Sequence, residues 1–308
     1  MPFDFAAPDG SFVAELTRRS PAASTWLAEL PARWQRCVTR WGLSQSGPIA
    51  YGRTSLVVPV TRDSGGRAAL KLVSPVVSAR DEMVALEAFG GDGAVALLDG
   101  DATEGTLLLE HLSGPSLTEL DPVSAMAAAG EVVAGLLGTT APPGTPTLAS
   151  GAARWAGQLR DQQRVSEQSG TALPEPVVDR AVRIVEALAD DPSTMLTHGD
   201  LSLDNIMGSS RGWLAIDPLL TAGTPEQEAH TVTRSCLSVA VAEPDPASTL
   251  RSWSDLFCRV AGLDAERAWQ VSYARFVASY LWEAQHDGEP TRVAALRRAS
   301  MAMAPTMG

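Results

Sequence analysis

The sequence has almost no lysine, few cysteines and no long apolar run. Of its 24 basic residues, 23 are arginine and one is a lysine, Lys71. The three cysteines (Cys37, Cys236 and Cys258) are an odd number without metal-site spacing, which predicts reduced thiols in a cytoplasmic protein. The longest apolar stretch, around residues 125–137, contains a glutamate. It therefore predicts a core helix and not a membrane span.

The chain is also short of positive charge. It carries 24 basic and 36 acidic side chains, a net charge of −12, which argues against a nucleic-acid or anionic-membrane partner. The same charge would attract a cationic small molecule, although an acidic surface also serves solubility alone. The first ten residues lack the basic-then-apolar pattern of a secretory signal. At 308 residues and 45% hydrophobic, the chain is long enough for two lobes with a core.

Alternating extended and helical segments predict a small N-terminal lobe. Residues 1–45 are expected to form a helical extension, with Trp26 and Trp34 on one face and Pro31 breaking or restarting the pattern. The segment 46–112 contains two extended stretches around a turn, a helix, and two further strands around another turn.

The segment 113–308 is predicted to be a larger, mostly helical lobe, beginning with alanine-rich helical sequence. Aromatic side chains recur at helical spacing in its last ninety residues. Such a pattern is more typical of core packing than of a cofactor cage. The aromatic residues expected in the core are Trp253, Phe257, Trp269, Tyr273, Phe276 and Trp282.

The solitary lysine lies in the middle of a predicted strand, in the stretch AALKLV. A charge there is costly unless it is paired, and Glu82 follows Lys71 by eleven positions on the predicted helix. A strand lysine held by a helix glutamate is an arrangement that presents an ammonium group to nucleotide phosphates. The alternative is an edge-strand lysine in water.

The stretch THGDLSLDNI, residues 197–206, places Asn205 five positions after Asp200. The stretch GWLAIDP then predicts a short strand that delivers Asp217. Phosphoryl transfer needs a carboxylate for the accepting hydroxyl and oxygen ligands for magnesium, and these residues supply both. The alternative is a solvated loop with coincidental spacing. No G-x-x-x-x-G-K-[ST] motif occurs, which excludes a P-loop kinase.

These residues and the segments SLVVPV, GGRAALKL, GGDGAVALLD, TLLLEHLSG and GWLAIDP, in that order, resemble the aminoglycoside phosphotransferases. Within that family the chain is most similar to the streptomycin 6-kinase and hydroxyurea phosphotransferase branch, over roughly residues 26–290. The resemblance implies an α+β, bilobal, protein-kinase-like fold. A small antiparallel β-sheet lobe with one key helix would precede a larger, mostly helical C-terminal lobe.

The resemblance also implies the role of each site residue. Asp200 would be the catalytic base, and Asn205 and Asp217 would hold Mg²⁺. His198 would brace the loop and take no part in the chemistry. The lysine would contact the α- and β-phosphates of ATP or GTP.

The remaining nucleotide-side residues are likewise implied by the resemblance. Glu82 would orient the lysine. Ser55, in YGRTS, would cover the phosphates, and the backbone of Glu110 and Leu112 would meet the adenine. A cleft between the two lobes is expected to bring these groups and the predicted catalytic loop, residues 197–206, together on one nucleotide.

The acceptor side departs from the family pattern. Ser202 stands where members usually have histidine, and GTPEQE (223–228) replaces GDPxxD, so the nucleotide half matches the family better than the acceptor half. Acidic side chains of the helical lobe are candidates for holding guanidinium or ammonium groups by charge-assisted hydrogen bonds. These candidates are Glu226, Glu228, Glu283 and Asp287.

Three functions follow. The first is an ATP- and Mg²⁺-dependent kinase of a cationic aminoglycoside such as streptomycin, conferring antibiotic resistance. The second keeps the chemistry but takes hydroxyurea, a sugar or another natural-product alcohol. The third is a nucleotide-binding pseudokinase, against which the full set of Lys71, Glu82, Asp200, Asn205 and Asp217 argues.

Overall fold

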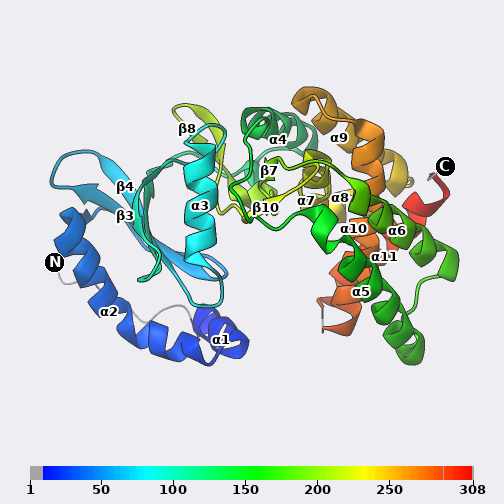
Figure 1. Cartoon of the computed structure of the whole chain (residues 1–308), viewed down its shortest axis with the longest axis horizontal. Coiled ribbons are helices and arrows are strands. Elements are labelled where there is room, and N and C mark those ends of the chain that lie inside the picture. Colours follow the sequence, from blue (N-terminus) through cyan, green and yellow to red (C-terminus); the bar gives the residue numbers. More distant parts are fainter. Residues whose placement is uncertain (1–9, 287, 307–308) are drawn as a thin grey trace. The chain divides into compact units, whose positions relative to one another are not determined.

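The computed structural model describes residues 10–286 and 288–306, and the chain divides into two compact units after Ser113. Two helices precede an antiparallel sheet in the N-terminal unit, and a third helix lies between its fourth and fifth strands (Figure 1). The elements of this unit are α1 (Gly10–Arg19), α2 (Ala22–Trp41), β1 (Leu43–Gln45), β2 (Ala50–Tyr51), β3 (Ser55–Arg62), β4 (Arg67–Val73), α3 (Ala79–Phe89), β5 (Leu97–Asp101) and β6 (Thr106–Glu110).

The sheet runs in the order β1-β3-β4-β6-β5, with β2 also paired to β3. The predicted hairpin is present as β3 and β4, which pair from Ser55 opposite Val73 to Thr61 opposite Arg67. The connecting turn includes Gly65, whose φ of 89° is in the left-handed region that favours glycine. The strands and the helix that the sequence predicts in this unit are therefore confirmed.

The prediction that Pro31 interrupts the N-terminal helix is wrong. Helix α2 runs through Pro31 without a break, and the chain turns earlier, between α1 and α2. A proline inside a helix removes one backbone hydrogen bond. Pro31 is exposed, so water can satisfy the carbonyl group that loses its partner. The buried side chains on the opposite face hold the helix against the sheet.

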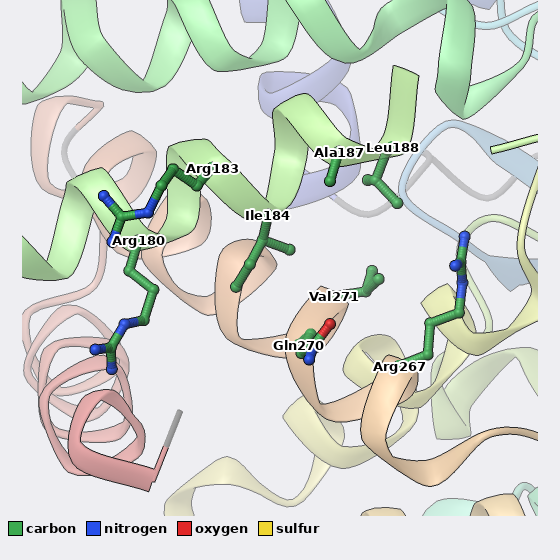
Figure 2. A pocket seen from close by; sticks show the side chains of 8 residues that line it. All are labelled: Arg180, Arg183, Ile184, Ala187, Leu188, Arg267, Gln270 and Val271. Carbon is green, nitrogen blue, oxygen red and sulfur yellow. The ribbon is translucent and has the colours of Figure 1, made fainter. Parts of the chain in front are cut away.

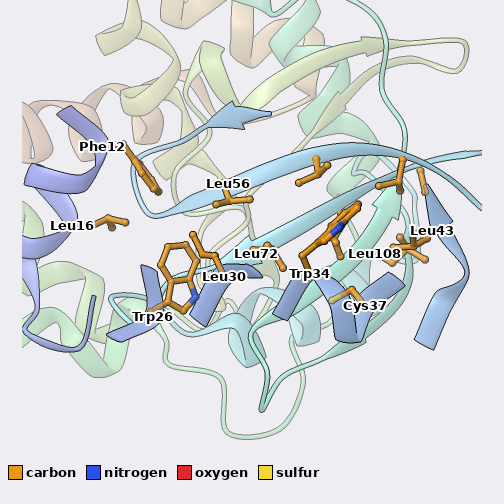
Figure 3. Packing of buried hydrophobic residues seen from close by; sticks show 14 of the residues in the cluster. Phe12, Leu16, Trp26, Leu30, Trp34, Cys37, Leu43, Leu56, Leu72 and Leu108 are labelled. Carbon is orange, nitrogen blue, oxygen red and sulfur yellow. The ribbon is translucent and has the colours of Figure 1, made fainter. Parts of the chain in front are cut away.

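That buried face forms the core of the N-terminal unit (Figure 3). Trp26, Leu30 and Trp34 of α2 pack with Leu56 and Leu72 of the sheet. Each fully buried side chain of this size stabilises the fold by about 1.5–3 kcal/mol. Helices α1 and α2 are thus part of the unit's core.

The C-terminal unit is mostly helical and contains two small two-stranded sheets. Helix α10 packs against α5, α6, α7, α9 and α11 (Figure 1). The longer helices are α4 (Pro122–Leu136), α5 (Leu148–Ser169), α6 (Glu175–Ala187), α7 (Glu228–Ser235), α8 (Leu237–Ala242), α9 (Pro246–Ala261), α10 (Ala265–Gln285) and α11 (Pro290–Met303). The short elements are η1 (Leu117–Glu119), η2 (Leu188–Asp190), β7 (Leu196–Thr197), η3 (Leu203–Asn205), β8 (Ile206–Ser209), β9 (Gly212–Ala215), β10 (Thr221–Ala222), η4 (Pro225–Gln227) and η5 (Ala304–Thr306).

Most of the aromatic core predicted for this unit is present. Five of the six aromatic side chains are buried, and Phe257 and Tyr273 are completely so. Trp282 is the exception, because half of its surface is exposed. Its ring stacks on the ring of His286, four residues later, with the ring centroids 4.5 Å apart. Helical spacing alone did not separate this exposed position from the buried ones.

Candidate active site

A buried ion pair joins the strand lysine to the helix glutamate in the N-terminal unit. Lys71 lies in β4, between β3 and β6. Glu82 lies in the first turn of α3, whose N-cap Ser78 accepts a hydrogen bond from the backbone N–H of Asp81. The Lys71 Nζ and Glu82 Oε1 atoms are 2.6 Å apart, and the side chains are only 4% and 10% exposed. The expected pair is present, and a lysine in bulk water is excluded.

The other nucleotide-side residues lie at the ends of strands in the same unit. Ser55 is buried at the start of β3, where its carbonyl group accepts a hydrogen bond from Gly52. Glu110 ends β6, and its N–H donates to the carbonyl group of Ala96 at 2.9 Å. Leu112 follows outside any helix or strand. Their roles toward a nucleotide stay predictions.

A β-hairpin in the C-terminal unit brings two of the predicted site residues close together. Strands β8 and β9 are antiparallel, with Ile206 opposite Ala215. Asn205 immediately precedes β8, and its carbonyl group accepts a hydrogen bond from the N–H of Ile216 at 2.9 Å. Asp217 is the next residue. The hairpin therefore brings Asn205 and Asp217 together at its base, although eleven residues separate them in the sequence.

Two local features orient these side chains. The Asn205 side-chain amide donates to the carbonyl group of Asp200 at 2.8 Å, which leaves the amide oxygen as the end that can accept or ligate. Asp217 has φ of 60° and is the one non-glycine residue with positive φ among those described. A left-handed backbone is costly for most L-residues, and at functional sites such conformations aim a side chain.

His198 braces the loop as expected. Its ring is completely buried, and Nε2 lies 2.8 Å from the carbonyl oxygen of Ile216. A carbonyl oxygen can only accept, so Nε2 carries the proton, and Nδ1 accepts from the N–H of Asp200 at 3.4 Å. The carbonyl group of His198 also accepts from Leu219. Because both ring nitrogens are occupied, the imidazole positions Asp200.

Two consecutive residues hold the loop from the other side. Glu228 is 2% exposed, and its Oε1 accepts a hydrogen bond from the N–H of Gly199 at 2.7 Å. Gln227 donates through Nε2 to the hydroxyl group of Thr197 at 2.7 Å. Because these contacts flank His198, the segment GTPEQE fixes the loop despite its departure from the family pattern.

The four acidic residues predicted for the acceptor have different surroundings. Glu226 accepts from the Thr224 hydroxyl group and from the N–H of Asp264. Glu283 forms an ion pair with Arg292 at 2.6 Å. Asp287 lies outside the described residues. Of the three that the structure describes, Glu228 is the one hydrogen-bonded to the catalytic loop, and acceptor binding by any of the four stays a prediction.

Asn205 and Asp217 fit a magnesium site. They offer one amide oxygen and one carboxylate, at the base of one hairpin. Within residues 10–286 and 288–306, no three His, Cys, Asp or Glu side chains are grouped to hold a metal. Mg²⁺ commonly takes only one or two protein ligands and completes its shell with water and substrate phosphates. A two-residue site therefore suits Mg²⁺ that arrives with a nucleotide.

Sequence patterns missed Arg275 and His230, which lie behind the segment that holds the loop: Arg275 contacts Gln227, and His230 is in the helix that begins with Glu228. The half-buried Arg275 of α10 donates to the Gln227 side chain at 3.3 Å. His230 of α7 is 2% exposed and lies 3.4 Å from the hydroxyl group of Ser279. Burial, followed by the charges of Arg275 and Arg234, lowers the pKa of His230 well below its ordinary value. No local motif marks either residue, because their contacts join α10 to η4 and to α7, which are distant in the sequence.

A cavity of about 340 Å³ between α6 and α10 is not part of this site (Figure 2). Its floor is apolar, formed by Ile184, Leu188 and Val271 among others. The head groups of its arginines point in different directions, so they form no common cradle for an anion.

In the part of the chain that the structure describes, no helix has the length and apolar character to cross a membrane.

Comparison with known proteins identifies the family. The family model described as "Aminoglycoside/hydroxyurea antibiotic resistance kinase" matches residues 40–288. A hydroxyurea phosphotransferase of Kitasatospora aureofaciens is 36% identical over 87% of this chain and 77% of its own. A streptomycin 6-kinase of Streptomyces griseus is 35% identical over 91% of each chain.

Solved structures support the fold. A choline/ethanolamine kinase family protein from Mesorhizobium loti has a TM-score of 0.60 at 17% identity, covering 90% of this chain and 94% of its own. At that identity the likeness concerns the fold alone, and it confirms the predicted kinase-like architecture. The family model and the relatives above 30% identity show more: the chain is a phosphotransferase that belongs to the family of aminoglycoside/hydroxyurea antibiotic resistance kinases.

Proposed function

We propose that this chain transfers the γ-phosphoryl group of ATP, with Mg²⁺, to a hydroxyl group of a cationic aminoglycoside such as streptomycin. The observation that carries the proposal is the 35% identity with the streptomycin 6-kinase of Streptomyces griseus over 91% of both chains. The net charge of −12 supports a cationic acceptor, because it raises the local concentration of positively charged molecules.

In this proposal Asp200 accepts the proton of the acceptor hydroxyl group and orients it for attack. The hydrogen bonds to His198, Gly199 and Asn205 keep that carboxylate's segment of the loop in one conformation. Asn205 and Asp217 would hold Mg²⁺, which would neutralise charge on the phosphates.

The N-terminal unit supplies the nucleotide contacts. Lys71 is oriented by Glu82 at 2.6 Å, so its ammonium group can contact the α- and β-phosphates. Ser55 covers the phosphates, and the backbone of Glu110 and Leu112 meets the adenine. Phosphorylation would add about −1.5 to −2 charges to the antibiotic and weaken its binding to an anionic RNA target.

A second acceptor, hydroxyurea, is favoured by the relative from Kitasatospora aureofaciens, which is named a hydroxyurea phosphotransferase and is 36% identical. Hydroxyurea is neutral and small. It would therefore gain little from the acidic charge of the chain, and its binding should depend only weakly on salt. A cationic aminoglycoside should bind more weakly as salt rises, because screening shortens the range of the attraction.

An ATP-consumption assay with streptomycin, hydroxyurea and neutral sugars distinguishes the candidates. Streptomycin-dependent turnover that falls with rising salt supports the first acceptor. Turnover with hydroxyurea alone supports the second. Nucleotide binding without turnover on any acceptor would contradict both and favour a pseudokinase.

A further inference from the structure

Among the described residues, a buried carboxylate beside the catalytic loop is hydrogen-bonded through only one of its two oxygens. Glu228 is 2% exposed, and its Oε1 accepts from Gly199. Its Oε2 is buried and, among the described residues, has no hydrogen-bond partner. An ionised carboxylate in such surroundings is costly unless a positive charge lies nearby.

Arg275 of α10 supplies that charge. Its pKa is lowered by burial, while the negative charges of Glu228 and Asp200 act in the opposite direction and Arg234 adds to the lowering. Arg275 is half-buried as a residue, and the lowering of its pKa by burial indicates that its guanidinium group is partly shielded from water. The charges of Arg275 and Glu228 thus compensate each other across the contact between α10 and α7.

The same guanidinium group reaches the loop by a second route. Its Nη1 donates to Gln227 Oε1 at 3.3 Å, and Gln227 Nε2 donates to the hydroxyl group of Thr197 at 2.7 Å. Thr197 lies at the end of β7, two residues before Gly199, which Glu228 holds. One side chain of α10 is therefore linked to both sides of His198.

We infer that Arg275 is a positioning residue for the catalytic loop, acting by compensating the buried charge of Glu228 and by fixing Gln227. The inference rests on the proposed function for its kinetic consequence, because Asp200 follows Gly199 directly. In this role Arg275 touches neither the nucleotide nor the acceptor. Its loss should therefore lower kcat and leave KM for ATP nearly unchanged.

The test is a double-mutant cycle. Arg275→Met removes the charge while keeping an unbranched side chain, and it leaves Glu228 uncompensated. We expect kcat to fall roughly 100-fold, the size typical of a displaced catalytic group. Glu228→Gln keeps an oxygen that can accept from Gly199 but removes the charge. The double variant should therefore recover most of the lost kcat.

Arg275→Lys keeps the charge and should retain more activity than Arg275→Met. Arg251→Met is the matched control, because Arg251 is also a half-buried arginine of this unit, but its partners are Asp255 and Glu266. Neither partner contacts the loop, so the control should keep the kcat of the unmodified protein.

Three outcomes would overturn the inference. The first is an Arg275→Met variant with unchanged kcat. The second is a double variant that is no better than Arg275→Met. The third outcome concerns folding: if Arg275→Met does not fold, the double variant Arg275→Met/Glu228→Gln should fold, and its failure to do so would overturn the inference. If the unmodified protein transfers no phosphoryl group, the proposed function fails instead. The same cycle is then measured by urea unfolding, where Glu228→Gln should restore the stability that Arg275→Met removes.

Discussion

The two units neutralise their buried charges in different ways. In the N-terminal unit, Lys71 and Glu82 touch directly at 2.6 Å. In the C-terminal unit, Glu228 is held by one backbone N–H, and Arg275 compensates its charge without any ion pair between them in the described chain. The first arrangement joins a strand to the next helix along the chain. The second joins helices whose residues are 47 positions apart (275 − 228).

The difference teaches what each unit must provide. A lysine proposed to contact phosphates needs one defined direction, and the close contact with Glu82 supplies it. A catalytic loop needs its backbone fixed at several points. His198, Gln227 and Glu228 share that task, so the electrostatic support is spread over several contacts.

The largest effect is expected from Asp200→Ala. Removing a general base lowers kcat by roughly 10²–10⁴-fold, whereas the affinity for nucleotide should stay nearly intact. ATP consumption with the preferred acceptor measures the first, and calorimetric titration with nucleotide measures the second. If Asp200→Ala kept a substantial share of the activity, Asp200 would not be the base. The loop of the C-terminal unit would then hold no identified catalytic group.

Breaking the direct pair should have the next largest effect. Lys71→Met leaves Glu82 buried without its partner, which costs about 3–5 kcal/mol of unfolding free energy. Urea unfolding measures the loss. The double variant Lys71→Met/Glu82→Gln should recover much of the stability but none of the activity.

The control for the buried pair is Arg40→Met, which breaks an exposed ion pair with Asp101 and should cost less than about 1 kcal/mol. Equal losses in Lys71→Met and in this control would show that the buried position of the pair contributes nothing. The direct, buried ion pair of the N-terminal unit would then stabilise the fold no more than an exposed ion pair does.

The buried imidazole of His230 predicts a pH dependence in the C-terminal unit. Its pKa is lowered well below the ordinary 6.5, first by burial and then by Arg275 and Arg234, so the ring is neutral in the folded state. As pH falls below 6.5, the unfolded state binds a proton that the folded state does not. The unfolding free energy should therefore decrease, by about 1.4 kcal/mol per pH unit from this group.

The pH effect is measured by urea unfolding from about pH 7.5 to about pH 5 in the unmodified protein and in His230→Gln. The variant should show a shallower loss of stability toward acid pH. Identical slopes in the two proteins would mean that His230 titrates normally and is not held neutral.

The smallest effect on stability is expected at Asp217, whose left-handed backbone favours Asp and Asn over other non-glycine residues. Asp217→Ala should lose about 1 kcal/mol more unfolding free energy than Asp217→Asn, as measured by thermal or urea unfolding. Both variants should lose activity, because both lack the carboxylate proposed to hold Mg²⁺. Equal stability of the two would show that the side chain does not support this conformation.

Local sequence patterns predicted much of the N-terminal unit and the catalytic loop. Strand alternation and a turn predicted β3 and β4, and the eleven-residue spacing predicted the contact between Lys71 and Glu82. These contacts lie between neighbouring elements, so a short window of sequence contains both partners. The hairpin of β8 and β9 likewise contains the information that places Asn205 beside Asp217.

Other features depended on contacts with distant parts of the chain. Pro31 continues a helix because buried side chains hold α2 on the sheet, and Trp282 is exposed although its spacing matches that of core residues. Glu226 and Glu283 have partners within the C-terminal unit that no local motif shows. A single sequence contains no local sign of which helix faces will meet.

The sequence by itself determined the class of chemistry, because one lysine and three oxygen-bearing side chains at set spacings belong to short, locally folded segments. Only the tertiary structure decided how the loop is held, because Glu228, Gln227 and Arg275 act through the packing of η4 and α7 against α10. Periodicity records which face of an element is buried, but the partner of a buried charge depends on which elements are packed together.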